Sequence, residues 1–387
     1  MKIILAGVAS IFGLNDIYTF FYNHNIKLVM VETEYMSQFI PDNELKFVHI
    51  QNEIKYEEKI IVIPLNEYWV SFVVKHPYMA RISDKALKAS RSKIFLQKLL
   101  ALNGIEHCEF YEETDIERFI LEQGRKIIIK PDSLYSGHGV KIVSALNIDG
   151  YRTYIKEAEQ VKQDTKYILD IDTTLVTFCE YIEGTEYSVD IFWYHGKCHI
   201  VRICRKYLEI VKDAPCVTAY VIEQLSEEIL GKIKIWSDLL FDQGDISFAQ
   251  FDFIVNESTQ KIIPIDFSCR VGGGMLQLFQ KKNSNVYLEC LKNIVYEHRN
   301  VLLTKLQECY QFHFIPLVTG LITDDNYYST NQIIKYKYKN DKVESVDPSA
   351  NNRLAIMLGD SFTIDKYLCI KDYLLIGEKN IKREENG

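Results

Sequence analysis

Short apolar runs separated by a helical pattern dominate the first part of the chain. Runs at Lys2–Ala6, Ile26–Val31 and Lys59–Pro64 have the length and composition of buried strands. Apolar spacing over Asn15–Asn23 predicts a helix between the first two runs. Strand–helix–strand alternation is typical of a parallel sheet with crossover helices. We therefore expect a small Rossmann-like domain over residues 1–89, although its glycines do not match the dinucleotide motif G-x-G-x-x-G.

Longer elements follow after residue 89. Amphipathic spacing predicts helices over Ser90–Asn103, Leu225–Phe241 and Ser284–His298, and a further helix over Gly150–Gln163. Alternating or continuous apolar runs predict strands at Lys126–Lys130, Val140–Val143, Thr177–Trp193, Cys198–Lys206, Ser247–Val255 and Lys261–Ser268. The chain from about Gln311 onward is rich in strand patterns. The fold class expected from this order is α/β, with α+β parts.

Composition narrows the class of protein. The chain is 47% hydrophobic and 25% charged, which is ordinary for a folded protein, and its 387 residues allow two or three domains. A net charge of -8 without a dense basic stripe argues against nucleic acid as a main partner. Nine cysteines without a C-x-x-C pair predict neither a zinc site nor a disulfide framework. No stretch approaches the roughly 20 apolar residues of a membrane helix, so we expect a protein of the reducing cytoplasm.

The segment Ile262–Gly274 combines several chemical groups on one strand. Alternation places Asp266, Ser268 and Arg270 on one face, and Ile265, Phe267 and Cys269 on the other. A carboxylate and a hydroxyl supply the oxygen ligands that Mg²⁺ prefers. An arginine can hold a phosphate or carboxylate with two parallel hydrogen bonds. The alternative interpretation is a half-exposed strand that carries an ion pair.

The preceding strand, SFAQFDFIV, predicts a second acid on the same face. Gln250 and Asp252 alternate with Phe251 and Phe253, and a loop of about five residues would join this strand to the next as a hairpin. In that register Asp266 lies opposite Gln250 and diagonal to Asp252. Two carboxylates this close repel each other unless a cation lies between them. The alternative is that both acids face water.

Two further loops carry candidate ligand contacts. In KPDSLYSGHGV, Lys130 ends a strand and small residues fill the turn, so backbone amides and the lysine could bind phosphate. The alternative is a plain hairpin loop. In EYIEGTEYSVD, a strand breaks at Gly184, where exposed backbone could bind a purine edge and a following acid could bind ribose. Here the alternative is a solvated turn, and we interpret His195 and His199 as turn residues.

Taken in order, these motifs resemble the ATP-grasp superfamily. The resemblance extends from about Ser90 to about His298, and single motifs are loose whereas their order is specific. Family members with this layout include carboxylate–amine ligases such as the L-amino acid ligases, biotin carboxylase and carbamoyl phosphate synthetase. The resemblance implies an ATP-grasp domain over residues 90–300 with a flap subdomain at about 123–185, and a strand-rich part at 301–387 that completes it.

The resemblance also implies roles for individual residues. ATP and Mg²⁺, with Mn²⁺ as an alternative ion, are the expected cofactors. The residues that match phosphate contacts are Lys93, Lys130 and the flap residues Ser136, Gly137, His138 and Gly139. The residues that match adenine and ribose contacts are Glu180, Tyr181, Ile182 and Glu186. Asp252, Asp266 and Ser268 match the metal site, with Gln250 as the alternative to Asp252, and Arg270, Lys130 and Arg205 are the catalytic candidates.

The final motif departs from the family pattern of glutamate, an apolar residue, asparagine and an arginine two residues on. Here it is Asp266, Phe267, Ser268, Cys269 and Arg270, so the acid is one methylene shorter and a hydroxyl replaces an amide. The resemblance implies a ligase that activates a small carboxylate as an acyl phosphate and joins it to an amine, with amino acids as expected substrates and a homodimer as the family precedent. The alternatives are a carboxylase, a small-molecule kinase, or an ATP-binding protein without ligase activity.

Overall fold

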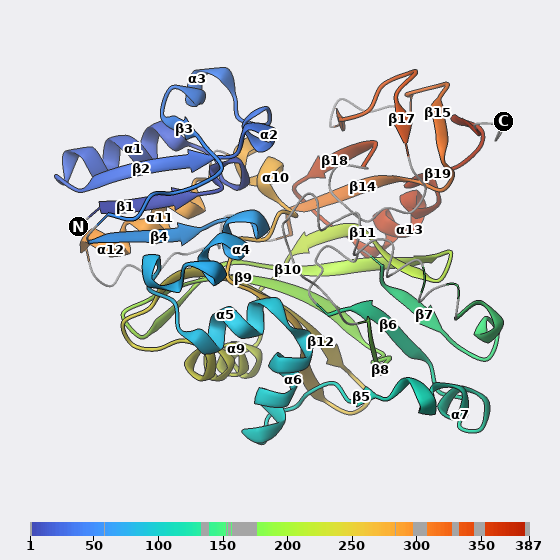
Figure 1. Ribbon diagram of the computed structural model, residues 1–387. Coiled ribbons are helices and arrows are strands. Elements are labelled where there is room, and N and C mark those ends of the chain that lie inside the picture. The colour runs from blue at the N-terminus through green and yellow to red at the C-terminus, as the bar shows by residue number, and fades with distance from the viewer. Residues whose placement is uncertain are drawn as a thin grey trace.

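The N-terminal part forms a parallel sheet in the order β3-β2-β1-β4 (Figure 1). The computed structural model describes residues 2–57, 59–132, 139–151, 153, 156, 176–282, 284–296, 308–326, 333–343 and 353–383. The α/β class predicted from the sequence is confirmed. The elements of this part are β1 (Lys2–Ala6), α1 (Leu14–Asn23), β2 (Lys27–Glu32), α2 (Glu34–Ser37), α3 (Asp42–Leu45), β3 (Val48–Ile50), β4 (Ile60–Pro64) and α4 (Glu67–Lys75).

A large, mostly antiparallel sheet forms the centre of the molecule, in the order β13-β12-β9-β10-β11-β14-β18-β16. Its strands are β9 (Thr185–Tyr194), β10 (Lys197–Val211), β11 (Ala214–Ile222), β12 (Ile246–Asn256), β13 (Lys261–Ser268), β14 (Tyr310–Pro316), β16 (Ile333–Lys335) and β18 (Ala355–Gly359). Helix α9 (Glu227–Leu240) covers one face, where its Trp236 packs against Phe251 and Phe253. Because this contact holds Phe251 and Phe253 on the side of α9, the alternate side chains of β12 point to the opposite face of the sheet.

A smaller sheet in the order β5-β8-β6-β7 lies at the edge of the central sheet (Figure 1). Its elements are β5 (Phe110–Tyr111), α7 (Ile116–Leu121), β6 (Ile127–Pro131), β7 (Lys141–Val143) and β8 (Val176–Glu180). The helix expected over Gly150–Gln163 falls largely outside the described residues. Strands β6 and β8 pair so that Lys130 lies beside Thr177, whose hydroxyl donates to the Lys130 carbonyl at 2.8 Å.

Helices and a third small sheet complete the chain. The remaining elements are α10 (Leu276–Lys281), α11 (Val286–Leu291), α12 (Asn293–Tyr296), β15 (Gly320–Ile322), β17 (Lys342–Val343), α13 (Ile364–Ile370), β19 (Leu375–Ile376) and β20 (Ile381–Arg383). Residues of α11 and of the N-terminal sheet share one apolar cluster, in which the rings of Phe12 and Tyr287 lie 6.1 Å apart. The same cluster includes Phe192 of β9 and Phe248 of β12, so the N-terminal sheet packs against the central sheet. Within the described residues, no helix is long and apolar enough to cross a membrane.

The helix predicted over Ser90–Asn103 is present, but it begins three residues later than predicted because Ser92 separates two helices. Helix α5 (Asp84–Arg91) ends there and α6 (Lys93–Leu102) begins. Ser92 is extended, and its hydroxyl accepts from the Phe95 amide at 3.1 Å as the N-cap of α6. Serine favours caps over helix interiors because its hydroxyl competes for backbone partners. Because Ser92 separates the two helices, Arg91 and Lys93 lie in different parts of the site described below.

The helix predicted over Ser284–His298 is also divided. Helices α11 and α12 are separated at Lys292, and the described part ends at residue 296. His195 lies in the β9–β10 turn with a φ of 48°, as predicted, whereas His199 is a buried residue of β10 rather than a turn residue. All nine cysteines are free thiols, in agreement with the absence of a predicted disulfide framework.

Candidate active site

Two carboxylates face each other on the β12–β13 hairpin. Asp252 lies directly opposite Asp266, and Gln250 lies opposite Ser268. The predicted register, with Asp266 opposite Gln250, is therefore wrong by two residues. The pairing shifts between Asp252 and Phe253, where β13 contains one residue more than its partner. The pairing next to the hairpin loop would place Asp252 and Asp266 on opposite faces. The β-bulge shifts the pairing by one residue and so brings both acids to the same face.

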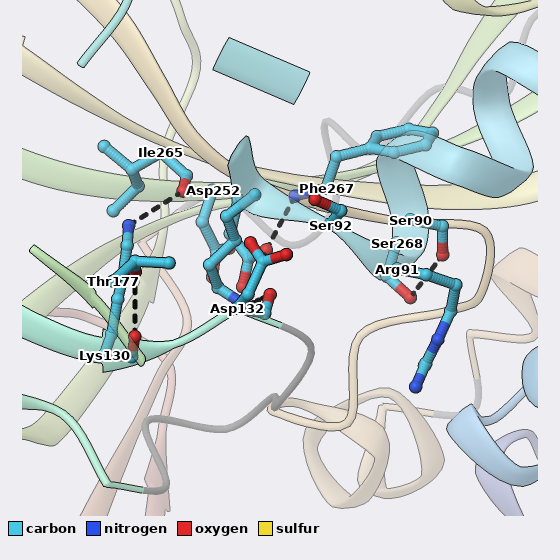
Figure 2. Close-up of polar contacts among 12 residues, drawn as sticks. Ser90, Arg91, Ser92, Lys130, Asp132, Thr177, Asp252, Ile265, Phe267 and Ser268 are labelled. Carbon is cyan, nitrogen blue, oxygen red and sulfur yellow. Dashed lines mark hydrogen bonds and ion pairs between the residues drawn. The ribbon is translucent and has the colours of Figure 1, made fainter. Parts of the chain in front are cut away.

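The extra residue in the bulge is Ile265. The predicted alternation placed Ile265 with Phe267 and Cys269, but its side chain packs in a separate small cluster with Ile182 and Ile263. The Ile265 carbonyl has no place in the strand ladder and lies 3.5 Å from Nζ of Lys130 (Figure 2). Bulges re-aim groups next to active sites. In this hairpin the bulge supplies an acceptor to a lysine from the neighbouring sheet.

Asp266 lies close to two buried lysines from different elements. Nζ of Lys93, the first residue of α6, is 3.5 Å from Oδ1 of Asp266 and 3.2 Å from the Asp132 carbonyl. Burial acts to lower the pKa of Lys130, but the neighbouring Cys179 and Cys108 and the Asp266 carboxylate leave it above its usual value. Lys130 therefore carries a positive charge at neutral pH. The sequence placed Lys93, Lys130 and Asp266 in one site, and the structure brings them together.

Asp252 belongs to a second charged group on the same face. Nζ of Lys206 lies 2.8 Å from Oδ2 of Asp252 and 2.6 Å from Oε1 of Glu186. Although burial acts to raise the pKa of Asp252, the Lys206 ammonium outweighs it and the pKa lies below its usual value. The two carboxylates in turn hold the pKa of Lys206 well above its usual value against the effect of burial. The predicted ribose acid, Glu186, is thus bound to a cation that sequence reasoning missed.

Arg270 is oriented by a carboxylate from the N-terminal part. Its Nε donates to Oε1 of Glu67 at 2.7 Å, and its Nη1 donates to Gln250 and to the Val271 carbonyl. Glu67 is the first residue of α4, whose cap is Asn66. Although burial acts to raise the pKa of Glu67, the guanidinium of Arg270, assisted by a second arginine, keeps it below its usual value. Arg270 is therefore held in one orientation at the end of β13.

The second arginine beside Glu67 is Arg91, at the end of α5. Its Nη1 lies 3.1 Å from Oε2 of Glu67, whereas its Nη2 is buried without a hydrogen-bond partner among the described residues. The hydroxyl of Ser268 also donates to Glu67, at 3.1 Å, and lies 3.4 Å from the Ser90 hydroxyl (Figure 2). Two guanidinium groups share one carboxylate, so this part of the site has a net positive charge. Ser268, a predicted metal ligand, is directed toward Glu67 and Ser90.

At the centre of this face lies an ion pair whose carboxylate accepts hydrogen bonds on both oxygens. Arg202 and Asp190 are almost completely buried, and Nε and Nη2 of Arg202 lie 2.6 and 3.2 Å from the two oxygens of Asp190. The Gly272 amide donates to Asp190 at 2.9 Å. A Cβ atom at Gly272 would lie 1.9 Å from Nη2 of Arg202, so only glycine allows this approach. The glycine run after Arg270 therefore crosses the polar face directly over the ion pair.

The same run continues over β11 and β14. A Cβ atom at Gly274 would lie 2.9 Å from the Tyr220 ring, and the Gly274 carbonyl accepts from Nε2 of Gln311 at 2.7 Å. The same Nε2 lies 2.8 Å from Nε2 of His313, and the rings of Tyr220 and His313 are 5.2 Å apart. Burial, assisted by the nearby Arg353, lowers the pKa of His313 well below its usual value, so the ring is neutral.

The other predicted contacts have mixed outcomes. Ser136, Gly137 and His138 lie outside the described residues, and Gly139 is described with a φ of 69°. Glu180 ends β8, and the Tyr181 amide donates to the Lys126 carbonyl at 3.2 Å. Ile182 is buried.

Arg205 lies on the opposite face of β10 from Lys206, because successive side chains alternate along a strand. Its Nη1 is 3.8 Å from Glu223. The contacts to Asp190 and Asp252 instead come from Arg202 and Lys206. The alternation in VRICRK, which places Arg202, Cys204 and Lys206 together, could have identified both residues from the sequence.

The acids fit a magnesium ion that binds mainly to phosphate and water. The described residues contain no group of three or more His, Cys, Asp or Glu side chains placed to hold a metal ion. Two facing carboxylates remain, of which the Asp252 side chain is 19% exposed and the Asp266 side chain 35% exposed. Mg²⁺ often binds through one or two carboxylates together with substrate phosphates. Asp252 and Asp266 satisfy that requirement without Ser268.

Comparison with known proteins identifies the domain that carries this site. Residues 123–277 match the family profile described as the ATP-grasp domain. The chain contains an ATP-grasp domain. Lys130, Asp252, Asp266 and Arg270 lie within the matched residues, whereas Lys93 precedes them. A search of curated proteins finds no match to the chain.

Solved structures share the fold of this protein over nearly the whole chain. An L-amino acid ligase from Bacillus licheniformis is 13% identical with a TM-score of 0.65, over 100% of this chain and 99% of the other. A carboxyaminoimidazole ribonucleotide synthase from Aspergillus clavatus, complexed with ATP, is 11% identical with a TM-score of 0.59, over 96% and 98%. The biotin carboxylase domain of a Hydrogenobacter thermophilus 2-oxoglutarate carboxylase, in complex with MgADP, ADP and bicarbonate, is 10% identical with a TM-score of 0.56, over 93% and 86%.

Proposed function

We propose that this protein is an ATP-dependent ligase that activates a small-molecule carboxylate as an acyl phosphate and couples it to an amine, with release of ADP and phosphate. The observation that carries the proposal is the convergence of Lys93, Lys130 and Asp266 opposite Asp252, with Arg270 two residues after the strand that carries Asp266. Phosphoryl transfer from ATP requires charge neutralisation and positioning more than covalent participation of the protein. In this proposal these residues provide both, and all of them except Lys93 lie within residues 123–277, which match the ATP-grasp domain.

In this proposal the lysines and acids bind ATP and its metal ion. Lys93 and Lys130 neutralise phosphate oxygens, and Asp252 and Asp266 hold Mg²⁺, which Mn²⁺ can replace. When bound, the ion draws negative charge from the triphosphate and makes the γ-phosphorus more electrophilic. A structure of the biotin carboxylase domain of a 2-oxoglutarate carboxylase contains MgADP, and the shared fold supports the same ligand here.

Arg270 stabilises the transferred phosphoryl group. A carboxylate oxygen of the acid substrate attacks the γ-phosphorus, and the bond from that phosphorus to the β–γ bridging oxygen breaks to give ADP and an acyl phosphate. Negative charge on the equatorial oxygens is then largest, and a fixed guanidinium lowers the free energy of that state. Glu67 and Gln250 fix Arg270 before the substrate arrives, so the guanidinium does not have to reorganise during the reaction.

The second half-reaction joins the amine. The amine lone pair attacks the acyl carbon, the carbon–oxygen bond to phosphate breaks, and the nitrogen loses a proton as the amide forms. Arg91 and Arg270 provide positive charge that remains close to the phosphate as it leaves. The acyl phosphate must be protected from water throughout.

A nucleotide-binding protein without ligase activity is the second candidate. The observation that favours it is the pairing of Asp252 with Lys206 and of Ser268 with Glu67, which occupies two of the predicted metal-binding side chains. In this case ATP binds but no substrate pair releases ADP. Carboxylation or phosphorylation of a single small molecule would give ADP without an amide product.

A screen of ADP release against pairs of amino acids, with mass spectrometry of the products, tests the proposal. A ligase forms ADP and a product whose mass equals that of the two substrates minus water, and it requires both substrates. The Arg270→Ala variant is the control for contaminating ATPases. ADP formation with a single substrate would instead support a kinase or carboxylase. ATP binding by calorimetry without ADP release from any pair would support the second candidate.

A further inference from the structure

Lys206 reaches across the polar face and contacts carboxylates on two other strands. Its Nζ lies 2.6 Å from Oε1 of Glu186 on β9 and 2.8 Å from Oδ2 of Asp252 on β12. Strand β9 lies between β10 and β12 in the sheet, so the side chain crosses β9 to reach Asp252. The two outer strands are roughly 10 Å apart, a distance that suits a long side chain. The ammonium therefore lies between two acids, where a cation relieves their repulsion.

An ion pair on α9 shows how this arrangement differs from a simple one. Nζ of Lys232 lies 2.9 and 3.0 Å from the two oxygens of a single carboxylate, Glu106, so one ammonium matches one acid. The Lys206 ammonium is instead shared by two acids. Lys206 is buried, whereas Glu186 and Asp252 are half-buried. The lysine thus lies beneath two acids that remain accessible from the side of the site.

Hydrogen bonds within the protein engage the oxygen atoms around Asp252. Its Oδ1 accepts from Nε2 of Gln250 at 3.0 Å, and Oε1 of Gln250 accepts from Arg270. The Ser268 hydroxyl donates to Glu67. A carboxylate has about four lone-pair sites, so Asp252 can still share one ion with Asp266. Two-ion sites need ligands for ions about 3.5–4 Å apart, and the described residues offer no group of three acids, histidines or cysteines for them.

Lysines match the acids in number at this end of the face. The acids are Glu186, Asp252 and Asp266, and the lysines are Lys93, Lys130 and Lys206. Divalent ions at phosphoryl-transfer sites neutralise the phosphates and the acids that hold them. Because Lys206 already balances part of the negative charge of Glu186 and Asp252, less of that charge is left to attract a second ion.

We propose that Lys206 takes the place of a second divalent cation, so that this site binds one ion per nucleotide, shared by Asp252 and Asp266. The proposal rests on the ATP-dependent function proposed above and specifies its cofactor as a single Mg²⁺ or Mn²⁺. The ammonium is a fixed charge that does not have to be bound from solution. Without it, Glu186 and Asp252 would be adjacent acids with no cation between them, an arrangement that attracts a divalent ion.

A count of bound Mn²⁺ tests the proposal without turnover. Electron paramagnetic resonance of the full chain, saturated with the non-hydrolysable ATP analogue AMP-PNP, measures free Mn²⁺ and therefore the ions bound per nucleotide. We expect one ion for the wild type and two for Lys206→Met. Without nucleotide, Lys206→Met should bind Mn²⁺ at least about ten-fold more tightly than the wild type, because the two acids then lack their ammonium. Two ions per nucleotide in the wild type, or one in the folded variant, would overturn the proposal.

Three further variants serve as controls. Lys232→Met removes a lysine from the pair on α9 and should leave the count at one. Lys206→Arg keeps the charge and should also bind one ion, and Glu186→Gln added to Lys206→Met should remove the second ion.

Thermal unfolding separates the proposal from a folding defect. If Lys206→Met is unstable, Mn²⁺ should raise its unfolding midpoint more than that of the wild type, and equal shifts would count against the proposal. If AMP-PNP does not bind, the ATP-dependent function fails, whereas the comparison of Mn²⁺ affinity without nucleotide still decides whether Lys206 occupies a cation position.

Discussion

Two carboxylates on the same sheet face, Asp190 and Asp266, differ in how completely the protein satisfies them. Asp190 is fully buried and accepts two hydrogen bonds from Arg202 and one from the Gly272 amide. Asp266 has a side chain that is 35% exposed, lies 3.5 Å from Lys93 and accepts from the Phe267 amide. A saturated acid has no capacity left for a ligand, whereas a partly satisfied one does. The two acids share a face but are suited to different tasks.

The largest expected effect is on turnover, in a variant of Arg270, which is proposed to act on the phosphoryl group. Replacement of Arg270 by alanine should lower kcat by about 10³-fold or more, as for arginines in other phosphoryl transfers. Glu67 keeps Arg91 as a partner, so the fold should persist. ADP release, with circular dichroism as the check on folding, measures both. Near-normal turnover in this variant would remove Arg270 from the mechanism.

The buried pair of Asp190 and Arg202 should instead contribute to the free energy of unfolding. Asp190→Asn leaves Arg202 buried without a counter-charge, and loss of one partner of a buried pair lowers the free energy of unfolding by about 3–5 kcal/mol. Asp266→Asn should change it by less than about 1 kcal/mol, because the side chain is partly exposed. Urea unfolding of the two variants side by side gives the comparison. Similar unfolding midpoints for both would show that the two acids do not differ in this respect.

A smaller effect is expected on metal affinity. Asp266→Asn should raise the Mg²⁺ concentration for half-maximal ADP release by about ten-fold, since one of two proposed carboxylate ligands is neutralised. Ser268→Ala is the matched control: its hydroxyl is directed to Glu67, so its Mg²⁺ titration should match that of the wild type. An unchanged titration for Asp266→Asn would exclude Asp266 as a ligand, and a shifted one for Ser268→Ala would restore Ser268.

A further expected effect concerns how stability depends on acid pH. The folded pKa of Glu67 lies below its ordinary value of 4.5, so the stabilisation from its ionised form is complete above that pH and is lost as pH falls through the folded pKa. Glu67→Gln should therefore differ most from wild type at neutral pH, and the difference should shrink below about pH 4.5. Unfolding midpoints between pH 3 and pH 7 measure this. A difference that grows toward low pH would contradict the assignment.

Much of the fold and part of the site could be predicted from local patterns. The alternation of Gln250 and Asp252 with aromatic residues placed the acid on the polar face, because α9 covers the phenylalanines. The register of the hairpin could not be predicted in the same way. It depends on a bulge at Ile265, which no turn residue indicates.

Contacts between distant segments were beyond the sequence. Arg270 and its partner Glu67 are separated by 203 residues, and no local pattern joins them. The alternation along β10 could have indicated Lys206, but the prediction named its neighbour Arg205, which lies on the opposite face. The structure brings Lys93 and Lys130 close to Asp266, but the sequence could not give their distances from it, which depend on how α6 packs against β13.

The bulge at Ile265 has a consequence for changes in chain length. In most strands, removal of one residue moves every later side chain to the opposite face. In β13 the deletion of Ile265 would leave a regular ladder in which Asp266 still lies opposite Asp252, because the deleted residue is the unpaired one. Such a deletion would remove the carbonyl that faces Lys130. Shortening this hairpin by one residue would therefore preserve the facing acids, while it changes the surroundings of the neighbouring lysine and the packing around Ile182 and Ile263.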